Sequence, residues 1–277
     1  MSTSAPATRA VSRPHMIGDS LTMLGRQLRH AKRYPEMTVI LLALPVIFLL
    51  LFAYVFGGTL GAGLAPGVGP QGGSRADYVN YVVPGILLLT IGSIAAGTST
   101  SVAMDMTQGI IARFRTMSIA PTAVLSGHAL GSVLQSMGTF VVVVGVALVV
   151  GFRPSADVGG WLAAAGLLTG VAFAVAWLSV ACGLVARTVE SASNYPMPLL
   201  LLPFLGSGFV PTESMPGPLA WFAENQPFTP IMDTLRALLL GTTVDAGAAW
   251  LSAGWCVVLS VVGYAWARRV YARPRKA

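Results

Sequence analysis

Long apolar stretches separated by short polar ones dominate this sequence. A membrane-spanning helix needs roughly 20 apolar residues, and six stretches meet that demand. The fifth is the least regular, because Pro196, Pro198 and Pro203 interrupt it, so we expect a kinked or broken helix there. The pattern predicts an all-α polytopic membrane protein with six transmembrane helices, at about residues 37–56, 81–104, 124–150, 161–186, 193–210 and 248–267.

The segment before the first apolar stretch divides into two parts. Residues 1–14 begin with a Ser/Thr/Ala-rich run and are predicted to be a disordered cytoplasmic N-terminus. Residues 15–36 alternate apolar and basic positions, which predicts an amphipathic helix on the inner membrane surface. The apolar positions are Ile17, Leu21, Leu24 and Leu28, and the basic ones are Arg26, Arg29, Lys32 and Arg33. A cleaved signal peptide is disfavoured because the first apolar run is longer than its roughly 7–15-residue apolar region.

The distribution of basic residues predicts the orientation. Fourteen Lys and Arg residues lie in the N-terminal segment, in residues 104–121, at Arg187 and in the basic tail 268–277. The alternate connections hold only Arg75, Arg153 and Arg236. Because cytoplasmic loops carry the excess of Lys and Arg, both termini and residues 104–121 are predicted to be cytoplasmic.

Composition supports the same class. Hydrophobic residues make up 55% of the 277 residues, charged residues only 10%, and the mean hydropathy is +0.72, which is too apolar for a soluble domain. The net charge of +7 would ordinarily raise nucleic acid as a partner. Since the basic residues sit mainly at the ends of apolar stretches, the membrane surface explains them better, and no nucleic-acid partner is expected.

The short polar and basic stretch at residues 104–121, between two apolar stretches, is predicted to form a cytoplasmic helix. Asp105 and Gln108 have the spacing of a capping box, and Pro121 marks a stop. Three apolar residues between them recur at helical spacing, namely Ile110, Phe114 and Met117. Two interpretations stay open: a docking surface for a soluble partner, or an ordinary basic loop that obeys the positive-inside rule.

The external connections differ from each other. Residues 67–72 match G-x-G-x-x-G, but they follow no strand and open no helix, so a dinucleotide site is disfavoured. Residues 206–245 are more structured: a short amphipathic piece begins at Pro216, and a second helix begins at Thr229-Pro230 and ends at Gly241. Their aromatic residues, Trp221, Phe222 and Phe228, favour interfacial or re-entrant anchoring, with substrate binding as the alternative.

The search for catalytic chemistry is mostly negative. No G-x-x-x-x-G-K-[ST] phosphate loop and no G-x-S-x-G elbow occurs, so the chain is not expected to hydrolyse ATP or act as an enzyme. His15, His30 and His128 are isolated from one another and form no cluster with Cys and carboxylates at ligand spacing, so no metal site is predicted. The predicted spans carry no ionisable residue near their middles, which disfavours an ion-coupled transporter.

Small and mildly polar residues do occur within the spans. They favour close helix packing, and a polar lining for a substrate path is the alternative. The candidates are Ser93, Gly97, Ser132, Gln135 and Thr139.

Three blocks of sequence resemble the type 2 ABC-transporter permeases, and within them the daunorubicin-resistance-like drug-export permeases. The first is Phe52-Ala-Tyr-Val-Phe-Gly-Gly-Thr-Leu with Tyr78-Val-Asn-Tyr-Val-Val-Pro-Gly-Ile-Leu. The second, residues 105–121, is similar to the family's cytoplasmic coupling helix. The third resembles its external re-entrant region, and comprises Gly208-Phe-Val-Pro-Thr-Glu-Ser-Met-Pro, Asn225-Gln-Pro-Phe-Thr-Pro and Asp233-Thr-Leu-Arg236.

The resemblance implies the permease subunit of an ATP-driven exporter of a hydrophobic drug or lipid-like molecule, in a bacterial plasma membrane. It implies a homodimer or close heterodimer, with the first and fifth spans facing the partner. A separate ATP-binding subunit would hold ATP and Mg, while this chain would bind no cofactor. Residues 37–267 would form the permease domain, with a coupling helix at about 105–120 and a re-entrant region at about 206–245.

The resemblance also assigns candidate roles to individual residues. Contact with the ATPase would fall to Asp105, Gln108, Arg113, Phe114 and Arg115. The external re-entrant region would depend on Gly208, Pro211, Pro216, Asn225, Pro227 and Arg236. The alternatives are an ion-coupled multidrug transporter, which needs a buried carboxylate, and a membrane-embedded lipid-modifying enzyme, which needs clustered His, Asp or Glu.

Overall fold

The structure is a computed structural model that describes residues 25, 35–58, 74–109 and 121–272. Every regular element in these ranges is helical, as the sequence predicts, and five helices are long and apolar enough to cross a membrane. These are α2 (Pro35–Leu51, continued by the π-helix η1, Phe52–Phe56), α4 (Arg75–Thr107), α6 (Pro121–Val150), α7 (Val158–Val185) and α12 (Ala246–Ala272). Most of the predicted interfacial helix (15–36), the N-terminus 1–14 and most of the basic tail lie outside the described residues.

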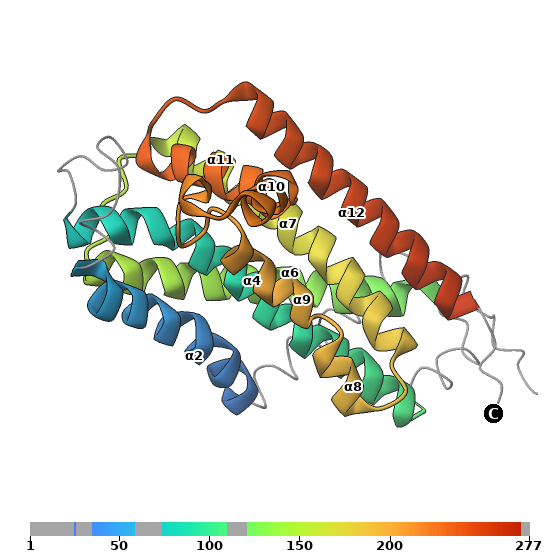
Figure 1. Cartoon of the computed structure of the whole chain (residues 1–277). Coiled ribbons are helices and arrows are strands. Elements are labelled where there is room, and N and C mark those ends of the chain that lie inside the picture. Colours follow the sequence, from blue (N-terminus) through green and yellow to red (C-terminus); the bar gives the residue numbers. More distant parts are fainter. Residues whose placement is uncertain (1–24, 26–34, 59–73, 110–120, 273–277) are drawn as a thin grey trace, which may run out of the picture.

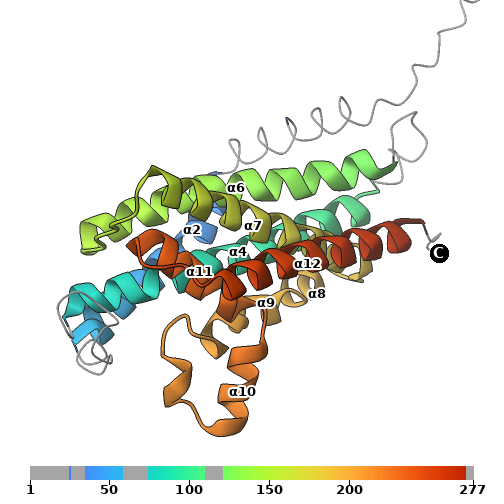
Figure 2. The same ribbon diagram turned by 90° about the horizontal axis from the view of Figure 1, so that it is seen from above.

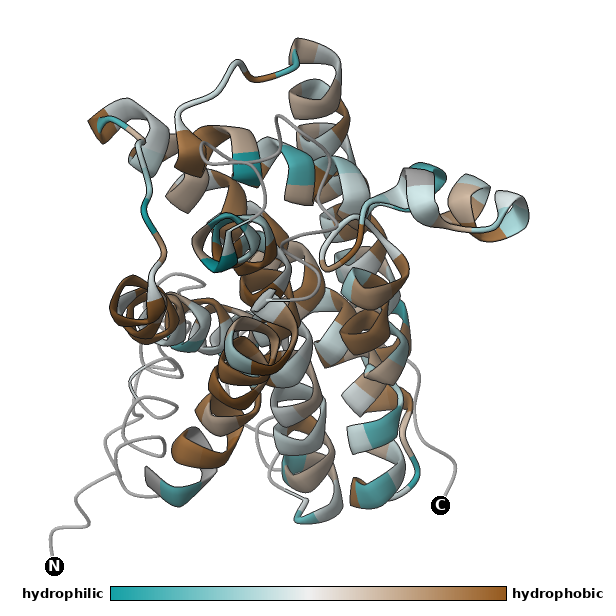
Figure 3. Ribbon diagram, turned by 60° about the vertical axis from the view of Figure 1, so that its left-hand side comes forward, coloured by the Kyte–Doolittle hydropathy of each residue, from teal (hydrophilic) through white to brown (hydrophobic). Residues whose placement is uncertain are grey.

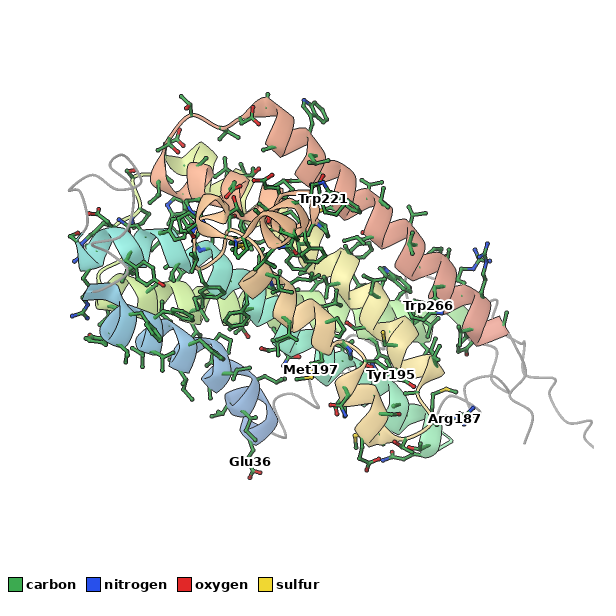
Figure 4. All side chains as sticks on the ribbon, in the orientation of Figure 1. Glu36, Arg187, Tyr195, Met197, Trp221 and Trp266 are labelled. Carbon is green, nitrogen blue, oxygen red and sulfur yellow. The ribbon has the colours of Figure 1, made fainter. Side chains whose placement is uncertain are left out.

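The long helices run side by side, α2 and α6 in one direction and α4, α7 and α12 in the opposite direction (Figures 1 and 2). One end of the bundle holds the starts of α2 and α6 and the ends of α4, α7 and α12. We call it the Arg187 end, after the residue that follows α7 there (Figure 4). The opposite end, where α4 starts and α6 ends, is called the Arg236 end.

Helix α4 is the centre of the bundle. Of its most apolar 18-residue stretch, 94% is buried within the protein, against 11% for the corresponding stretch of α12. The outer helices α2, α6 and α12 instead expose large apolar side chains, such as Val149 at 87% and Trp250 at 79%. Figure 3 shows that apolar residues extend along the long helices of the bundle. Such surfaces are stable in lipid, because hydrocarbon solvates apolar side chains as well as another helix does.

Helix starts follow local capping chemistry rather than hydropathy. Helix α4 begins six residues before the predicted span because Ser74 and Asp77 form a capping box, in which the Asp77 amide donates to Ser74 Oγ at 3.2 Å. The Asp157 carboxylate caps α7 by accepting from the Gly160 amide at 2.7 Å. Polar residues at these starts therefore extend helices that the apolar pattern alone makes too short.

The fifth predicted span is broken, as its prolines indicate. It comprises α8 (Val189–Asn194), α9 (Met197–Leu201) and the 3-10 helix η2 (Leu202–Leu205), followed by a turn at residues 206–209. Proline has no amide hydrogen to donate, so Pro196 and Pro203 interrupt the helical hydrogen-bond ladder where these pieces meet. The pieces pack along α4. We call residues 189–205 the broken segment.

The predicted external region, 206–245, contains three further helices. They are η3 (Thr212–Ser214), α10 (Gly217–Asn225), which stands out from the bundle in Figure 2, and α11 (Phe228–Leu240), which packs on α4, α7 and α12. Gly241 ends α11 with a φ of +63°, as predicted. The predicted helix start at Thr229-Pro230 is wrong: α11 begins at Phe228 with Pro227 as its N-cap, and the Thr229 hydroxyl donates to the Ala223 carbonyl.

Candidate functional site

A buried polar contact joins α4 to α6 at the Arg187 end. His128 Nε2 lies 3.1 Å from Asp105 Oδ2, and the two side chains are only 2% and 13% exposed. Sequence reasoning missed this pair because 23 residues separate its members. Only the antiparallel arrangement of α4 and α6 brings the last turn of one helix against the second turn of the other. The signal that could have found it is a His two turns into one span and an Asp just before the end of the preceding span.

The predicted start of a coupling helix at Asp105 is wrong. Asp105 does not open a new helix, because α4 continues to Thr107, and Gln108 is its C-cap, with its amide donating to the Met104 carbonyl at 2.9 Å. Gly109 then leaves the helical conformation with a φ of +69°. The other proposed coupling residues, Arg113, Phe114 and Arg115, lie outside the described residues.

Of the candidate path residues, Ser132 and Gly97 lie in contacts between helices. The Thr98 hydroxyl of α4 donates to the Ser132 hydroxyl of α6 at 2.9 Å. Gly97 faces α2, where an added Cβ would lie 3.1 Å from Leu41 Cδ1. The remaining hydroxyls bond within their own helices: Ser93 donates to the Leu89 carbonyl and Thr139 to the Gln135 carbonyl. These side chains satisfy their polar groups inside the bundle, which permits Ser and Thr at membrane depth.

The backbones of α7 and of the broken segment each lie very close to α4 at a glycine. An added Cβ at Gly183 of α7 would lie 2.5 Å from the Ser99 carbonyl oxygen, and one at Gly92 would lie 2.8 Å from Leu200 Cα of the broken segment. Neither contact leaves room for a side chain. Glycine at these two positions therefore sets how closely α7 and the broken segment approach the central helix.

At the Arg236 end, the 206–209 turn is held against the start of α4. An added Cβ at Gly85 would lie 2.7 Å from the Gly208 carbonyl oxygen, so the two backbones touch. The Tyr78 hydroxyl donates to the Phe209 carbonyl at 3.4 Å. The turn thus depends on a glycine in α4 that sequence reasoning did not single out.

Arg236 of α11 holds the same turn from the other side. Its guanidinium donates to Asp233 Oδ1 at 2.7 Å and to the Ser207 carbonyl at 2.6 Å, and it stacks on the Tyr81 ring at 3.9 Å. The Ser207 hydroxyl completes the cluster by donating to the same Asp233 oxygen at 2.7 Å. The guanidinium therefore links α11, α4 and the turn, and its side chain is only 14% exposed.

The other predicted residues of the external region shape its helices. Pro211 precedes η3, Pro216 precedes α10 and Pro227 precedes α11, so each proline stands where a helix needs no amide donor. The Asn225 side chain donates to the Trp221 carbonyl at 2.7 Å near the end of α10. Trp221 itself is 68% exposed on the projecting helix (Figure 4).

An aromatic cluster joins the first span to the broken segment and its turn, and sequence reasoning missed it. The rings of Phe204 and Phe209 stack with centroids 4.5 Å apart, and Phe52 stacks on Phe209 at the same distance. Phe48 meets Phe204 edge-on at 5.5 Å. Because such ring pairs add stability beyond burial, this cluster fixes η1 against the end of the broken segment.

Comparison with known proteins identifies the family. The model of the ABC-2 type transporter family matches residues 20–240. The chain belongs to this family. As an ABC-2 permease it is the membrane subunit of an ABC exporter rather than the ATPase, and it is a multi-pass membrane protein.

Two named relatives narrow the subfamily. The chain is 30% identical, over 83% of its own length and 78% of the relative's, to the daunorubicin resistance ABC transporter permease protein DrrB1 of Streptomyces coeruleorubidus. It is 27% identical, over 64% of its own length and 67% of the relative's, to the probable doxorubicin resistance ABC transporter permease protein DrrC of Mycobacterium tuberculosis. The ABC-2 permease thus belongs with the drug-resistance permeases, as the resemblance in sequence predicts.

Among the described residues, no group of three or more His, Cys, Asp and Glu side chains is arranged to hold a metal ion. The chemistry available in this part of the permease is helix packing, polar pairing between helices and aromatic stacking.

Proposed function

We propose that this permease exports a hydrophobic drug or lipid-like molecule across a bacterial plasma membrane, using ATP that a separate ATP-binding subunit hydrolyses with Mg. The observation that carries the proposal is the family match over residues 20–240, together with relatives named for daunorubicin and doxorubicin resistance. The chain's own sequence contains no phosphate-binding loop. In this proposal the energy comes from the partner subunit.

The proposed orientation puts the Arg187 end in the cytoplasm. Arg187, Arg268 and Arg269 lie at this end, and the excess of Lys and Arg elsewhere in the sequence belongs to the same side. With both termini cytoplasmic, the chain must cross the membrane an even number of times. The broken segment supplies the sixth crossing in this proposal, beside the five long helices.

A second permease subunit is proposed to cover the face formed by α2 and the broken segment. Leu201 is 46% exposed and Leu205 40% exposed on a stretch where the backbone changes from α to 3-10 helix. Irregular backbone at membrane depth is tolerated only where protein covers it or where it lines a water-filled cavity. Both situations arise if two copies, or two similar chains, meet on this face and enclose the path between them.

The ATP-binding subunit is proposed to dock on the stretch between α4 and α6 that holds Arg113, Phe114 and Arg115. In this proposal Phe114 fills an apolar cleft of the partner, while Arg113 and Arg115 pair with carboxylates at the rim. An aromatic anchor of this kind typically contributes about 2 kcal/mol or more to an interface. Rim charges contribute less and mainly orient the partner.

The test is co-expression with the ATP-binding subunit that the same cell makes for this permease. We expect the two chains to co-purify, ATP hydrolysis to require the partner, and daunorubicin export from loaded cells to require both. Replacing Phe114 with Ala should leave insertion and dimerisation intact but remove the partner and export. Export at the wild-type rate with the partner still bound would show that residues 105–120 are only a loop.

A further inference from the structure

The strongest unexplained feature is the contact between Asp105 and His128. Both side chains are largely buried, one at the end of α4 and one in α6, and Nε2 and Oδ2 lie 3.1 Å apart. Ionisable side chains in membrane helices are expensive to bury, so a pair that serves no purpose is readily replaced by apolar residues. Its position also excludes a role in holding the middle of the bundle together.

The end of α4 is fixed on its other side by small residues. Ala103 of α4 packs with Ala186, which follows α7, and with Ala192 of α8, and these three side chains form a separate buried cluster. One turn earlier, the Gly183 contact with the Ser99 carbonyl brings α7 onto the α4 backbone. Alanine and glycine contacts of this kind have no flexible side chain to absorb a shift, so neighbouring helices must move together.

The last turn of α4 is therefore a junction between two parts of the permease. A directional polar contact ties it to α6, and rigid packing ties it to α7 and to α8, the first piece of the broken segment. The Asp105–His128 contact thus connects the end of α4 to α6, and the contacts of Ala103 with Ala192 connect it to the broken segment.

We propose that Asp105 and His128 are positioning residues for transport: their contact makes the ends of α4 and α6 move as one unit, so that ATPase motion reaches the broken segment. This inference rests on the proposed function, in which the ATPase acts at the Arg187 end. It differs from the sequence interpretation of Asp105, since the carboxylate acts inside the bundle rather than on the partner's surface. The chemical requirement is a hydrogen-bonding pair, not merely a filled volume.

The experiment separates coupling from packing. The variants are Asp105→Leu with His128→Leu, which fills the volume without a polar contact, and the exchange of Asp105→His with His128→Asp, which restores a contact in reverse. Thr169→Val is the matched control, because Thr169 of α7 makes a polar contact with Met137 Sδ of α6 at 3.4 Å, away from this end. Each is purified with its ATP-binding partner and placed in vesicles, and we measure thermal stability, partner retention, ATP hydrolysis and daunorubicin moved per ATP.

The double-leucine variant should keep its stability and its partner while moving roughly tenfold less daunorubicin per ATP, the size expected when a coupling contact is lost. The exchanged pair should recover most of that ratio, and Thr169→Val should match the wild type. A wild-type ratio in the double-leucine variant would overturn the inference and leave the proposed function standing. Failure of the wild-type complex to move daunorubicin with ATP, or transport driven by a proton gradient without the partner, would overturn the proposed function and the inference with it.

Discussion

Replacing Arg236 with Ala should release the 206–209 turn from the bundle. The variant loses three charge-assisted hydrogen bonds, to the Asp233 carboxylate at 2.7 Å, to the Ser207 carbonyl at 2.6 Å and to the Tyr81 carbonyl at 3.3 Å, and the stack on the Tyr81 ring. A hydrogen bond to a charged group contributes about 1.5–3 kcal/mol when buried, and a cation–π contact about 1 kcal/mol. The Asp233 side chain is 45% exposed, so water screens that pair and its share falls to about 1 kcal/mol or less.

The total is about 3 kcal/mol, because contacts that share one guanidinium do not add fully. At 1.4 kcal/mol per factor of ten, the open form of the turn should become about a hundredfold more populated. Hydrogen–deuterium exchange of the purified permease in nanodiscs measures this directly. Amides of residues 206–209 and of the first turns of α11 should exchange about a hundred times faster if they exchange through this opening.

Arg153→Ala is the matched control at the same end of the bundle. Among the residues that the structure describes, the Arg153 side chain donates only to the carbonyls of Leu148 and Phe152, which are close to it in sequence, so exchange at 206–209 should not change. Unchanged exchange in Arg236→Ala would show that the glycine contact with α4 holds the turn without the guanidinium. The interpretation of Arg236 would then be refuted.

Three further predictions follow from backbone geometry and from sequence. Gly183→Ala should lower the free energy of unfolding by about 1–3 kcal/mol, because α7 must move away from the Ser99 carbonyl to make room for the added methyl group. Gly166→Ala is the control and should be neutral or stabilising, since no atom lies near its added Cβ. Equal denaturation midpoints for the two variants would contradict this prediction. Gly241→Ala should cost about 1 kcal/mol, since its φ of +63° is strained for alanine, and an unchanged melting temperature would argue against the strain. Phe114→Ala should abolish co-purification of the ATP-binding subunit, and undiminished pull-down would contradict the proposed docking surface.

The long helices are predictable from the sequence because lipid imposes one simple rule on them. A span must be long, apolar and internally hydrogen-bonded, so the long apolar runs that form α6 and α12 can be recognised in the sequence alone. Pro196 and Pro203 likewise predict the broken segment, since proline has no backbone amide hydrogen to donate to the helical hydrogen-bond ladder. Helix ends are less visible: Ser74 and Asp77 extend α4 beyond its apolar stretch through capping alone.

The candidate site was less predictable because its contacts join residues that are distant in sequence. Asp105 has the spacing of a helix start, yet it is the partner of a histidine 23 residues later, and only the packing of α4 on α6 reveals this. The family resemblance singled out Arg236, but its hydrogen bond to the Ser207 carbonyl and its stack on the Tyr81 ring depend on how α11 packs on the bundle. Hydropathy carries no information about which side chains on neighbouring helices meet.

The aromatic cluster illustrates the same limit. Phe48, Phe52 and Phe56 recur every four residues, which predicts one apolar stripe on the first span but not what the stripe contacts. The structure shows Phe52 stacked on Phe209 and Phe48 against Phe204. The stripe therefore fastens the first span to the end of the broken segment rather than facing lipid alone.

Transport into vesicles tests whether this permease moves its substrate with energy from a separate ATP-binding subunit. Purified permease is reconstituted with and without the partner, and daunorubicin movement is followed after MgATP is added to the side that exposes the Arg187 end. The account predicts ATP-dependent movement only when both chains are present, and none when a non-hydrolysable ATP analogue replaces ATP. ATP-dependent movement by the permease alone, or movement that persists with the analogue, would contradict it.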